Sequence, residues 1–164
     1  MRRVGIALLL AMLLLALSVS AAFADSPHFI SASASVDNAG NLVATFKEAG
    51  LGTTLKTESI TLSADASATY ACINGGGNHP KATNKETKSG PVSGSGSFPV
   101  RNGQTTGSIT VGPPGPGDFS CPNGQKLTLV LVSYTNVTLT GLAGDTADIP
   151  GTFSRCLFPG VGIC

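Results

Sequence analysis

The sequence predicts an all-β fold, an antiparallel β-sandwich of seven to eight short strands. Beyond the first 24 residues, β-branched residues are abundant and no window keeps a 3.6-residue apolar period, which argues against helices. Alternating apolar and polar segments are separated by Gly, Pro and Asn at intervals of about ten residues. Four cysteines in a chain with an export signal predict disulfides that staple the strands together. A small closed β-barrel is the alternative arrangement.

The N-terminus has the three parts of a secretory signal peptide. Arg2 and Arg3 precede a nearly unbroken apolar stretch over residues 4–19, and Ala22-Phe23-Ala24 provides a cleavage motif. A membrane anchor is the rival interpretation, but the stretch is shorter than the ~20 residues that span a bilayer. We therefore expect a signal peptide over residues 1–24 and a single β-sandwich domain over residues 25–164. The expected location is secreted, with association to the cell surface as a variant.

The first half of this domain is expected to hold four strands. Residues 37–41 are rich in Asn, Asp and Gly, so the segments that flank them are expected to form a hairpin. Residues 50–52 contain two glycines and end the hairpin. Two further segments each place alternate apolar residues on one face, as half-buried strands do. The four expected strands are residues 29–36, 42–46, 58–64 and 68–73.

Residues 74–97 are expected to form a long irregular loop. This segment contains three consecutive glycines, three lysines and the run Ser93-Gly94-Ser95-Gly96, and it has no apolar periodicity. Loops of this length are uncommon in compact domains, and they often bind partners.

The second half of the domain is expected to contribute four more strands. Asn102-Gly103 suits a tight turn between the first two of them, and residues 113–117 form a second irregular loop. The strongest strand is apolar on both faces over its first part and is expected to bend at Asn136. Seven to eight strands at this spacing indicate a sandwich of immunoglobulin-like type. These expected strands are residues 98–100, 107–111, 127–139 and 147–153.

Four cysteines allow three disulfide pairings. We favour Cys72 with Cys121, which lie at comparable strand-to-loop junctions, and Cys156 with Cys164, which are near neighbours in the C-terminal tail. A zinc site is not expected, because the sequence contains no Cys-x-x-Cys pair.

The charge and the residue inventory exclude several function classes. Without Arg2 and Arg3, eight basic residues stand against nine acidic ones, so no long-range field would attract nucleic acid or an anionic membrane. Only two histidines are present, His28 and His79, and there is no Gly-x-Ser-x-Gly elbow. The acidic residues fall mostly in expected turns. We therefore expect no catalytic residue, no metal site and no cofactor.

The most distinctive stretch follows Cys72. Its glycines can present backbone N–H groups as an anion nest, and lysines lie nearby. Two interpretations stay open, a loop that faces a partner and a solvated loop anchored by the cysteine; the second is favoured. Asn136-Val137-Thr138 also fits an N-glycosylation sequon, with glycosylation of Asn136 left open. The candidate binding-loop residues are Asn74, Gly75, Gly76, Gly77, Asn78, His79 and Lys81.

Several of these motifs together carry a resemblance to known proteins. The Ala-rich leader, the run from Cys72 to Lys81, Cys121-Pro122-Asn123-Gly124-Gln125 and residues 129–139 resemble a group of small secreted proteins of filamentous Gram-positive bacteria. The resemblance covers most of the mature chain and implies no activity and no site residues. The general appearance is also similar to the enediyne-carrying chromoproteins, which are exported sandwiches with two disulfides. Their cysteines close short loops, and a Cys72–Cys121 bridge departs from that pattern.

The expected function is that of a secreted, non-enzymatic module that binds an extracellular protein or cell-wall partner, or contributes to an envelope layer. One alternative is a small-molecule carrier or inhibitor, which needs an apolar pocket lined by Phe and Leu. The other is an enzyme with an unrecognised site, which needs His79 beside an acid and a serine.

Overall fold

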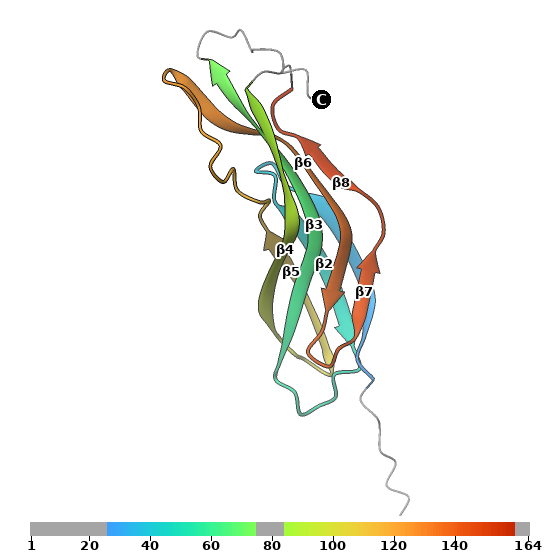
Figure 1. The fold of residues 1–164 in the computed structure, drawn as a ribbon. Coiled ribbons are helices and arrows are strands. Elements are labelled where there is room, and N and C mark those ends of the chain that lie inside the picture. The colour runs from blue at the N-terminus through green and yellow to red at the C-terminus, as the bar shows by residue number, and fades with distance from the viewer. Residues whose placement is uncertain (1–25, 75–83, 160–164) are drawn as a thin grey trace, which may run out of the picture.

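The computed structural model describes residues 26–74 and 84–159, and within them eight strands form two antiparallel sheets. Figure 1 shows the sheets packed face to face, with longer strands in one sheet than in the other. The three-stranded sheet has the order β1-β2-β5, and the five-stranded sheet has the order β4-β3-β6-β7 with β8 also paired to β6. The strands are β1 (His28–Val36), β2 (Leu42–Ala49), β3 (Thr57–Asn74), β4 (Lys85–Pro99), β5 (Gln104–Val111), β6 (Gln125–Thr140), β7 (Thr146–Ile149) and β8 (Phe153–Cys156).

The two sheets confirm the predicted sandwich and exclude the closed barrel for the described strands. β1 and β5 are the edges of the smaller sheet, and β4 and the β7–β8 pair are the edges of the larger one. The predicted hairpin of β1 and β2 is confirmed. The Asp37 carboxylate accepts hydrogen bonds from the backbone N–H groups of Ala39 and Asn41, at 2.9 and 2.8 Å, and Gly40 has a φ of +89°.

Two of the predicted strands are one long strand. β3 runs without interruption through residues 65–67, which lie between the two predicted strands. Ala64, Ala66 and Ala68 are all buried, so the inward alternation continues through this segment. Because the side chains of this segment are small, their apolar alternation is only a weak signal for a strand. The reverse holds at the C-terminal end, where one predicted strand is two, β7 and β8, separated around Pro150.

The predicted irregular loop over residues 74–97 is wrong for its second part. Residues from Lys85 onward form β4, which pairs with β3 along its whole length and absorbs most of the expected strand at 98–100. Several inward positions of β4 are occupied by glycine, so the apolar alternation that would predict a strand is missing. A Cβ on Gly94 would lie 2.7 Å from the Val111 side chain, and one on Gly96 would lie 2.8 Å from the Phe98 ring. The neighbouring side chains fill the inner face of β4.

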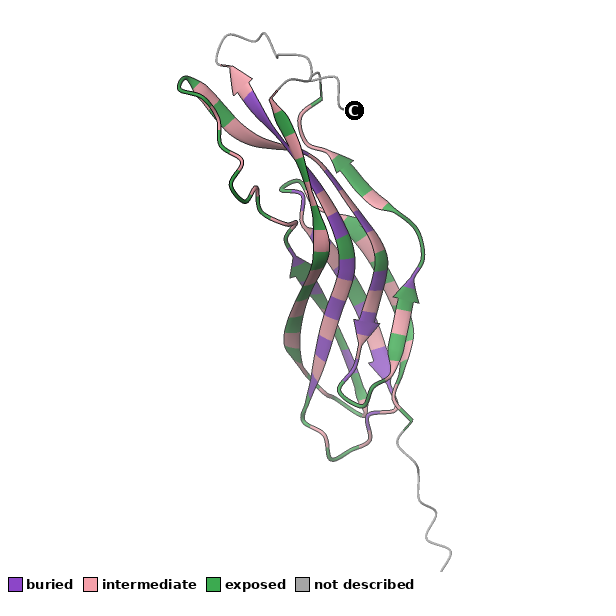
Figure 2. Cartoon of the chain, in the orientation of Figure 1, coloured by how far each residue is buried: buried purple, intermediate pink, exposed green. Residues whose placement is uncertain are grey.

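The core lies between the sheets, and Figure 2 shows more buried residues alternating with less buried ones along the strands. Its aromatic centre is Phe46, whose ring packs edge-on against Phe29 and Phe98 at centroid distances of 6.1 and 4.9 Å. Gly107 makes room for this group, because a Cβ there would lie 2.4 Å from the Phe98 ring.

Two bulges change which residues of β6 face the core. The register with β3 shifts once between Thr69 and Tyr70 and again between Ser63 and Asp65. The first shift explains why this strand is apolar on both faces near Val130. The second lies at Asn136, which has a φ of +52°, so the predicted bend is confirmed.

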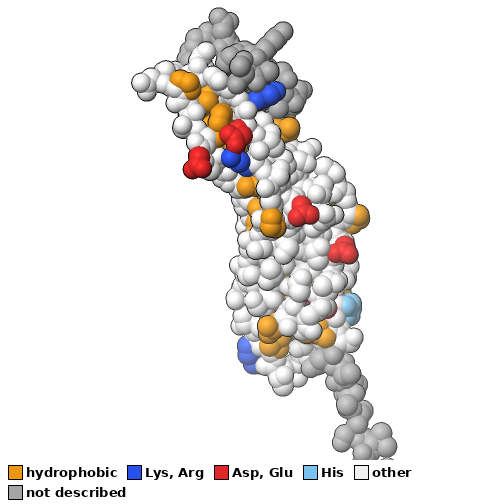
Figure 3. All heavy atoms as spheres, in the orientation of Figure 1, with side chains coloured by type: hydrophobic (Ala, Val, Ile, Leu, Met, Phe, Trp, Pro, Cys, Tyr) orange, Lys and Arg blue, Asp and Glu red, His pale blue; other side chains and the backbone are white. Residues whose placement is uncertain are grey.

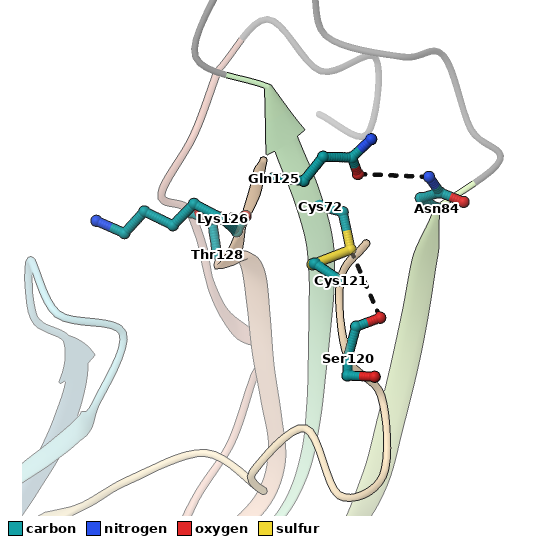
Figure 4. The surroundings of a disulfide bond; sticks show 7 residues. All are labelled: Cys72, Asn84, Ser120, Cys121, Gln125, Lys126 and Thr128. Carbon is teal, nitrogen blue, oxygen red and sulfur yellow. Dashed lines mark hydrogen bonds between the residues drawn. A yellow bond between two sulfur atoms is a disulfide. The ribbon is translucent and has the colours of Figure 1, made fainter. Parts of the chain in front are cut away.

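At one end, β3, β4 and β6 extend beyond the smaller sheet (Figure 1). The β5–β6 connection covers the inner face of this extension in place of a sheet. Tyr70 Oη donates a 2.7 Å hydrogen bond to the Pro114 carbonyl, and Phe119 packs against the core. The predicted disulfide between Cys72 and Cys121 is confirmed and joins the connection to β3 (Figure 4).

Cys156 is also disulfide-bonded. Cys164 lies outside the described residues, so the Cys156–Cys164 pairing stays a prediction, as does the signal peptide over residues 1–24. The described residues contain no helix long and apolar enough to cross a membrane.

Candidate functional site

The outer face of the five-stranded sheet carries an array of hydroxyl groups, here called the hydroxyl face. It arises because β3 alternates mostly apolar residues inward with Ser and Thr outward, and the outward positions of β4 and β6 are also occupied mainly by Ser and Thr. Figure 3 views the molecule from this side and shows few charged groups over its central part. The hydroxyl face comprises Ser59, Thr61, Ser63, Ser67 and Thr69 of β3, Thr87, Ser89, Ser93, Ser95 and Ser97 of β4, and Ser133, Thr135, Thr138 and Thr140 of β6.

Many of these hydroxyls bond one another across the strands. Thr61 and Ser95 lie 2.8 Å apart, Oγ to Oγ, and Thr69 and Thr87 lie 2.9 Å apart. Cross-strand pairs of this kind hold the side chains in fixed rotamers. Each hydroxyl has one donor and two acceptor positions, so a paired hydroxyl keeps capacity for a further partner. The hydroxyls of this face are therefore held in place and are still able to form hydrogen bonds.

Asn136 is the centre of this face. The bulge exposes its side chain, and Nδ2 donates a 2.8 Å hydrogen bond to Asp65 Oδ2. Next to it, Thr138 Oγ1 donates a 2.8 Å hydrogen bond to Asp148 Oδ1. Both carboxylates are exposed, so the bulge gathers an amide, two carboxylates and hydroxyls within a small area.

Two shallow hollows flank Asn136, and both include it. The larger, about 490 Å³, lies toward β7 and includes Thr135, Thr138 and Asp148. The other, about 380 Å³, lies toward β4 and includes Ser63, Asp65 and Ser93. Among the described residues, no cationic side chain lines either hollow. This set of groups can bind neutral hydroxylated molecules through hydrogen bonds, and it would repel anions.

A second polar group is buried at the end of the sandwich opposite the disulfide. Glu48 of β2 is 0% exposed and Glu58 of β3 is 1% exposed, and Asp145 lies in the turn between β6 and β7. Glu58 Oε1 accepts a hydrogen bond from the Leu142 N–H. The carboxylate oxygens of Glu48 and Asp145 are buried and have no donor. Burial, and then the charges of Asp145 and Glu58, raise the pKa of Glu48 to about 8.

An apolar basin of about 330 Å³ opens beside these acids. Its walls include Pro27, Leu51, Leu55 and Leu142, and Glu58 lines it as well. In the described residues no group of three or more His, Cys, Asp or Glu side chains is arranged to hold a metal ion.

The predicted binding loop is represented by one described residue. Asn74 ends β3 and lines a hollow of about 430 Å³ together with Gln125, Lys126 and Phe158. Figure 4 shows the adjoining contact, in which Asn84 Nδ2 approaches Gln125 Oε1 at 3.5 Å. The remaining predicted loop residues, Gly75, Gly76, Gly77, Asn78, His79 and Lys81, lie outside the described residues.

Comparison with known proteins finds no match to any family model, curated protein or solved structure. Sequence reasoning missed both polar groups, although one signal was present. Glu48 lies two residues after Phe46, and Glu58 lies two residues before Ile60. Because side chains two residues apart on a strand point to the same face, alternation alone places both glutamates on the core face. The pairing of Asn136 with Asp65 had no signal in the sequence, because 71 residues separate them.

Proposed function

We propose that this protein is a secreted, non-enzymatic binding module that attaches to a neutral, hydroxyl-rich polymer, such as a cell-wall glycan, through its hydroxyl face. The single observation that carries the proposal is the pair of polar hollows that share Asn136. An amide donates, carboxylates accept and hydroxyls do both, and these are the groups that hydrogen-bond sugar hydroxyls. The described lining of both hollows contains carboxylates and no cationic side chain, which disfavours an anionic polymer.

Export to an oxidising compartment is part of the proposal. The leader pattern and the disulfide between Cys72 and Cys121 support it. The resemblance to secreted proteins of filamentous Gram-positive bacteria is consistent with the same location.

The strand order supports an immunoglobulin-like scaffold. In chain order, β1, β2 and β5 correspond to strands A, B and E, and β3, β6 and β7 correspond to strands C, F and G. β4 lies beside β3 as strand C′ lies beside C. Such scaffolds present a rigid surface for recognition.

Binding on this face is expected to be weak for each sugar unit. The face lacks the exposed aromatic rings on which sugars commonly stack, so hydrogen bonds that replace those to water supply the affinity, at about 1 kcal/mol each. A long face that contacts several units of one polymer compensates through multivalency. Soluble monosaccharides should therefore compete poorly with an extended polymer.

Co-sedimentation with insoluble neutral glycans tests the proposal, with Asn136→Gly as the site variant. Glycine keeps the left-handed backbone and removes the amide, and the loss of one net hydrogen bond should lower affinity roughly fivefold. Asn102→Gly is the matched control, because Asn102 has a φ of +51° in the β4–β5 turn, away from the face. If both variants sediment like the wild type, or the wild type fails to sediment, the proposal is wrong.

The apolar basin favours a second candidate, a carrier of small apolar molecules. Leu51, Leu55 and Leu142 line it, although no Phe does. Uptake of an environment-sensitive apolar dye, abolished by Leu142→Ser and unchanged by Asn136→Gly, would support the carrier. The enzyme alternative gains no support from the described histidine, because His28 is exposed and its Nδ1 lies 2.8 Å from the Ser26 carbonyl oxygen.

A further inference from the structure

Three carboxylates from distant parts of the sequence meet at the end of the sandwich that lacks a disulfide. Glu48 extends inward from β2, Glu58 from β3, and Asp145 from the β6–β7 turn. Gly141 allows the approach, because a Cβ there would lie 2.5 Å from Asp145 Oδ1. The same turn is fastened to β3 by the hydrogen bond from the Leu142 N–H to Glu58.

Glu58 has a donor, but Glu48 and Asp145 do not. Both oxygens of each of these two carboxylates are buried without a hydrogen-bond partner, although the Asp145 carboxylate lies in hydrogen-bonding range of Glu48. Two ionised carboxylates in this position have no proton to form the bond, and each would be left unsatisfied in a medium of low polarity. A single proton between them removes one of the two charges and forms one hydrogen bond from an oxygen of one group to an oxygen of the other.

None of the described cationic side chains around Glu48 and Asp145 is placed to balance their negative charge. On β2, Lys47 lies on the opposite face from Glu48 because successive strand side chains alternate. In the sheet register, Glu48 of β2 lies opposite Thr105 of β5. The Thr105 hydroxyl donates its hydrogen bond to the Pro99 carbonyl oxygen. The groups whose charge acts on Glu48 are Asp145 and Glu58. The nearby ionisable side chains of β1, of the segment before β3 and of the β4–β5 turn are exposed: His28, Lys56 and Arg101.

We propose that Glu48 and Asp145 share one proton, and that this carboxyl–carboxylate bond fastens the β6–β7 turn to the smaller sheet and releases it when the proton is lost in alkaline solution. Hydroxide accepts the proton to form water, and two adjacent carboxylates remain. Their repulsion, with Glu58 as a third negative charge, pushes the turn outward. Leu142 and Ala143 of this turn line the apolar basin, so release changes the shape of the basin.

The surroundings of Glu48 favour its protonated form, as the shared proton requires. Burial and the neighbouring acids raise the pKa of Glu48 to about 8, from an ordinary value of 4.5. The unfolded chain loses this proton at lower pH than the folded protein does. The stability contributed by the proton is therefore complete below the ordinary pKa and is lost as the pH rises toward the folded value.

The direct test follows the side-chain carboxyl carbons by NMR while the pH of the purified protein is raised. We expect one carboxyl resonance to titrate with a midpoint near 8 and to disappear from this range in Glu48→Gln. Asp145→Asn should move the Glu48 midpoint to lower pH, because an amide donor replaces the shared proton. A Glu48 carboxyl that titrates in the ordinary acidic range overturns the proposal.

Thermal unfolding gives an independent readout. Wild-type protein should lose roughly 10 °C in Tm between about pH 5 and pH 8, and Glu48→Gln should lose much less. Glu86→Gln is the matched control, because Glu86 is partly exposed and pairs with Lys88 on β4. The proposal fails if Glu48→Gln is as sensitive to pH as the control. It also fails if calcium ions, and not acidity, restore the alkaline Tm of the wild type, because a cation would then occupy the place of the proton.

Discussion

The two ends of the sandwich are held together by different chemistry. At one end, the Cys72–Cys121 disulfide and a tyrosine hydroxyl attach the β5–β6 connection to β3. At the other end, Glu48 and Asp145 lie against each other beneath the β6–β7 turn. A covalent bond is indifferent to pH, and a shared proton is not. One small core can thus be held by a covalent bond at one end and by a pH-dependent hydrogen bond at the other.

Removing the disulfide tests the permanent end and has the largest expected effect. The bridge spans 49 residues, so in the loop-entropy model replacing Cys72 and Cys121 by Ala costs about 4 kcal/mol of unfolding free energy. Urea unfolding at two pH values measures it. The loss should be the same at about pH 6 and pH 9. A loss that varies strongly with pH would break the contrast between the two ends.

Gly141→Ala tests the conditional end and should have an intermediate effect. The new Cβ would displace the Asp145 carboxylate from its position 2.5 Å away and separate it from Glu48. We expect a loss of about 1–2 kcal/mol at neutral pH, measured by urea unfolding, and a lower pKa for Glu48. Gly90→Ala is the control, because no atom lies within 4 Å of a Cβ at that site. Equal effects of the two substitutions would count against the approach of the two acids.

Tyr70→Phe has the smallest expected effect. It removes the 2.7 Å hydrogen bond to the Pro114 carbonyl at the disulfide end, at a cost of about 1 kcal/mol. Tyr134→Phe should cost more, because Tyr134 is fully buried and its partner, the Gly40 carbonyl, would be left without a donor. Thermal unfolding of both variants checks the order. The reverse order would show that the disulfide end depends more on the Tyr70 hydroxyl than the core depends on the Tyr134 hydroxyl.

The features that the sequence predicted well are local ones. The hairpin over residues 37–41, the turn at Asn102-Gly103 and the bend at Asn136 each depend on residues that tolerate positive φ. Alternation predicted the strands with bulky apolar residues. The predicted binding-loop residues after Asn74 lie outside the described residues, so their role stays a prediction.

The sequence by itself determined the all-β class and the position of most turns, because alternation and turn chemistry act between residues that are close in the chain. It only favoured Cys72 with Cys121 among three possible pairings, and the structure confirmed that pairing. Only the tertiary structure decided that β4 is a strand, since Gly94 and Gly96 give no apolar signal and their space is filled by Val111 and Phe98. It also decided the neighbours of Glu48. A carboxyl group's pKa is set by its burial and by the charges around it, and those were brought together by folding from residues far apart in the chain.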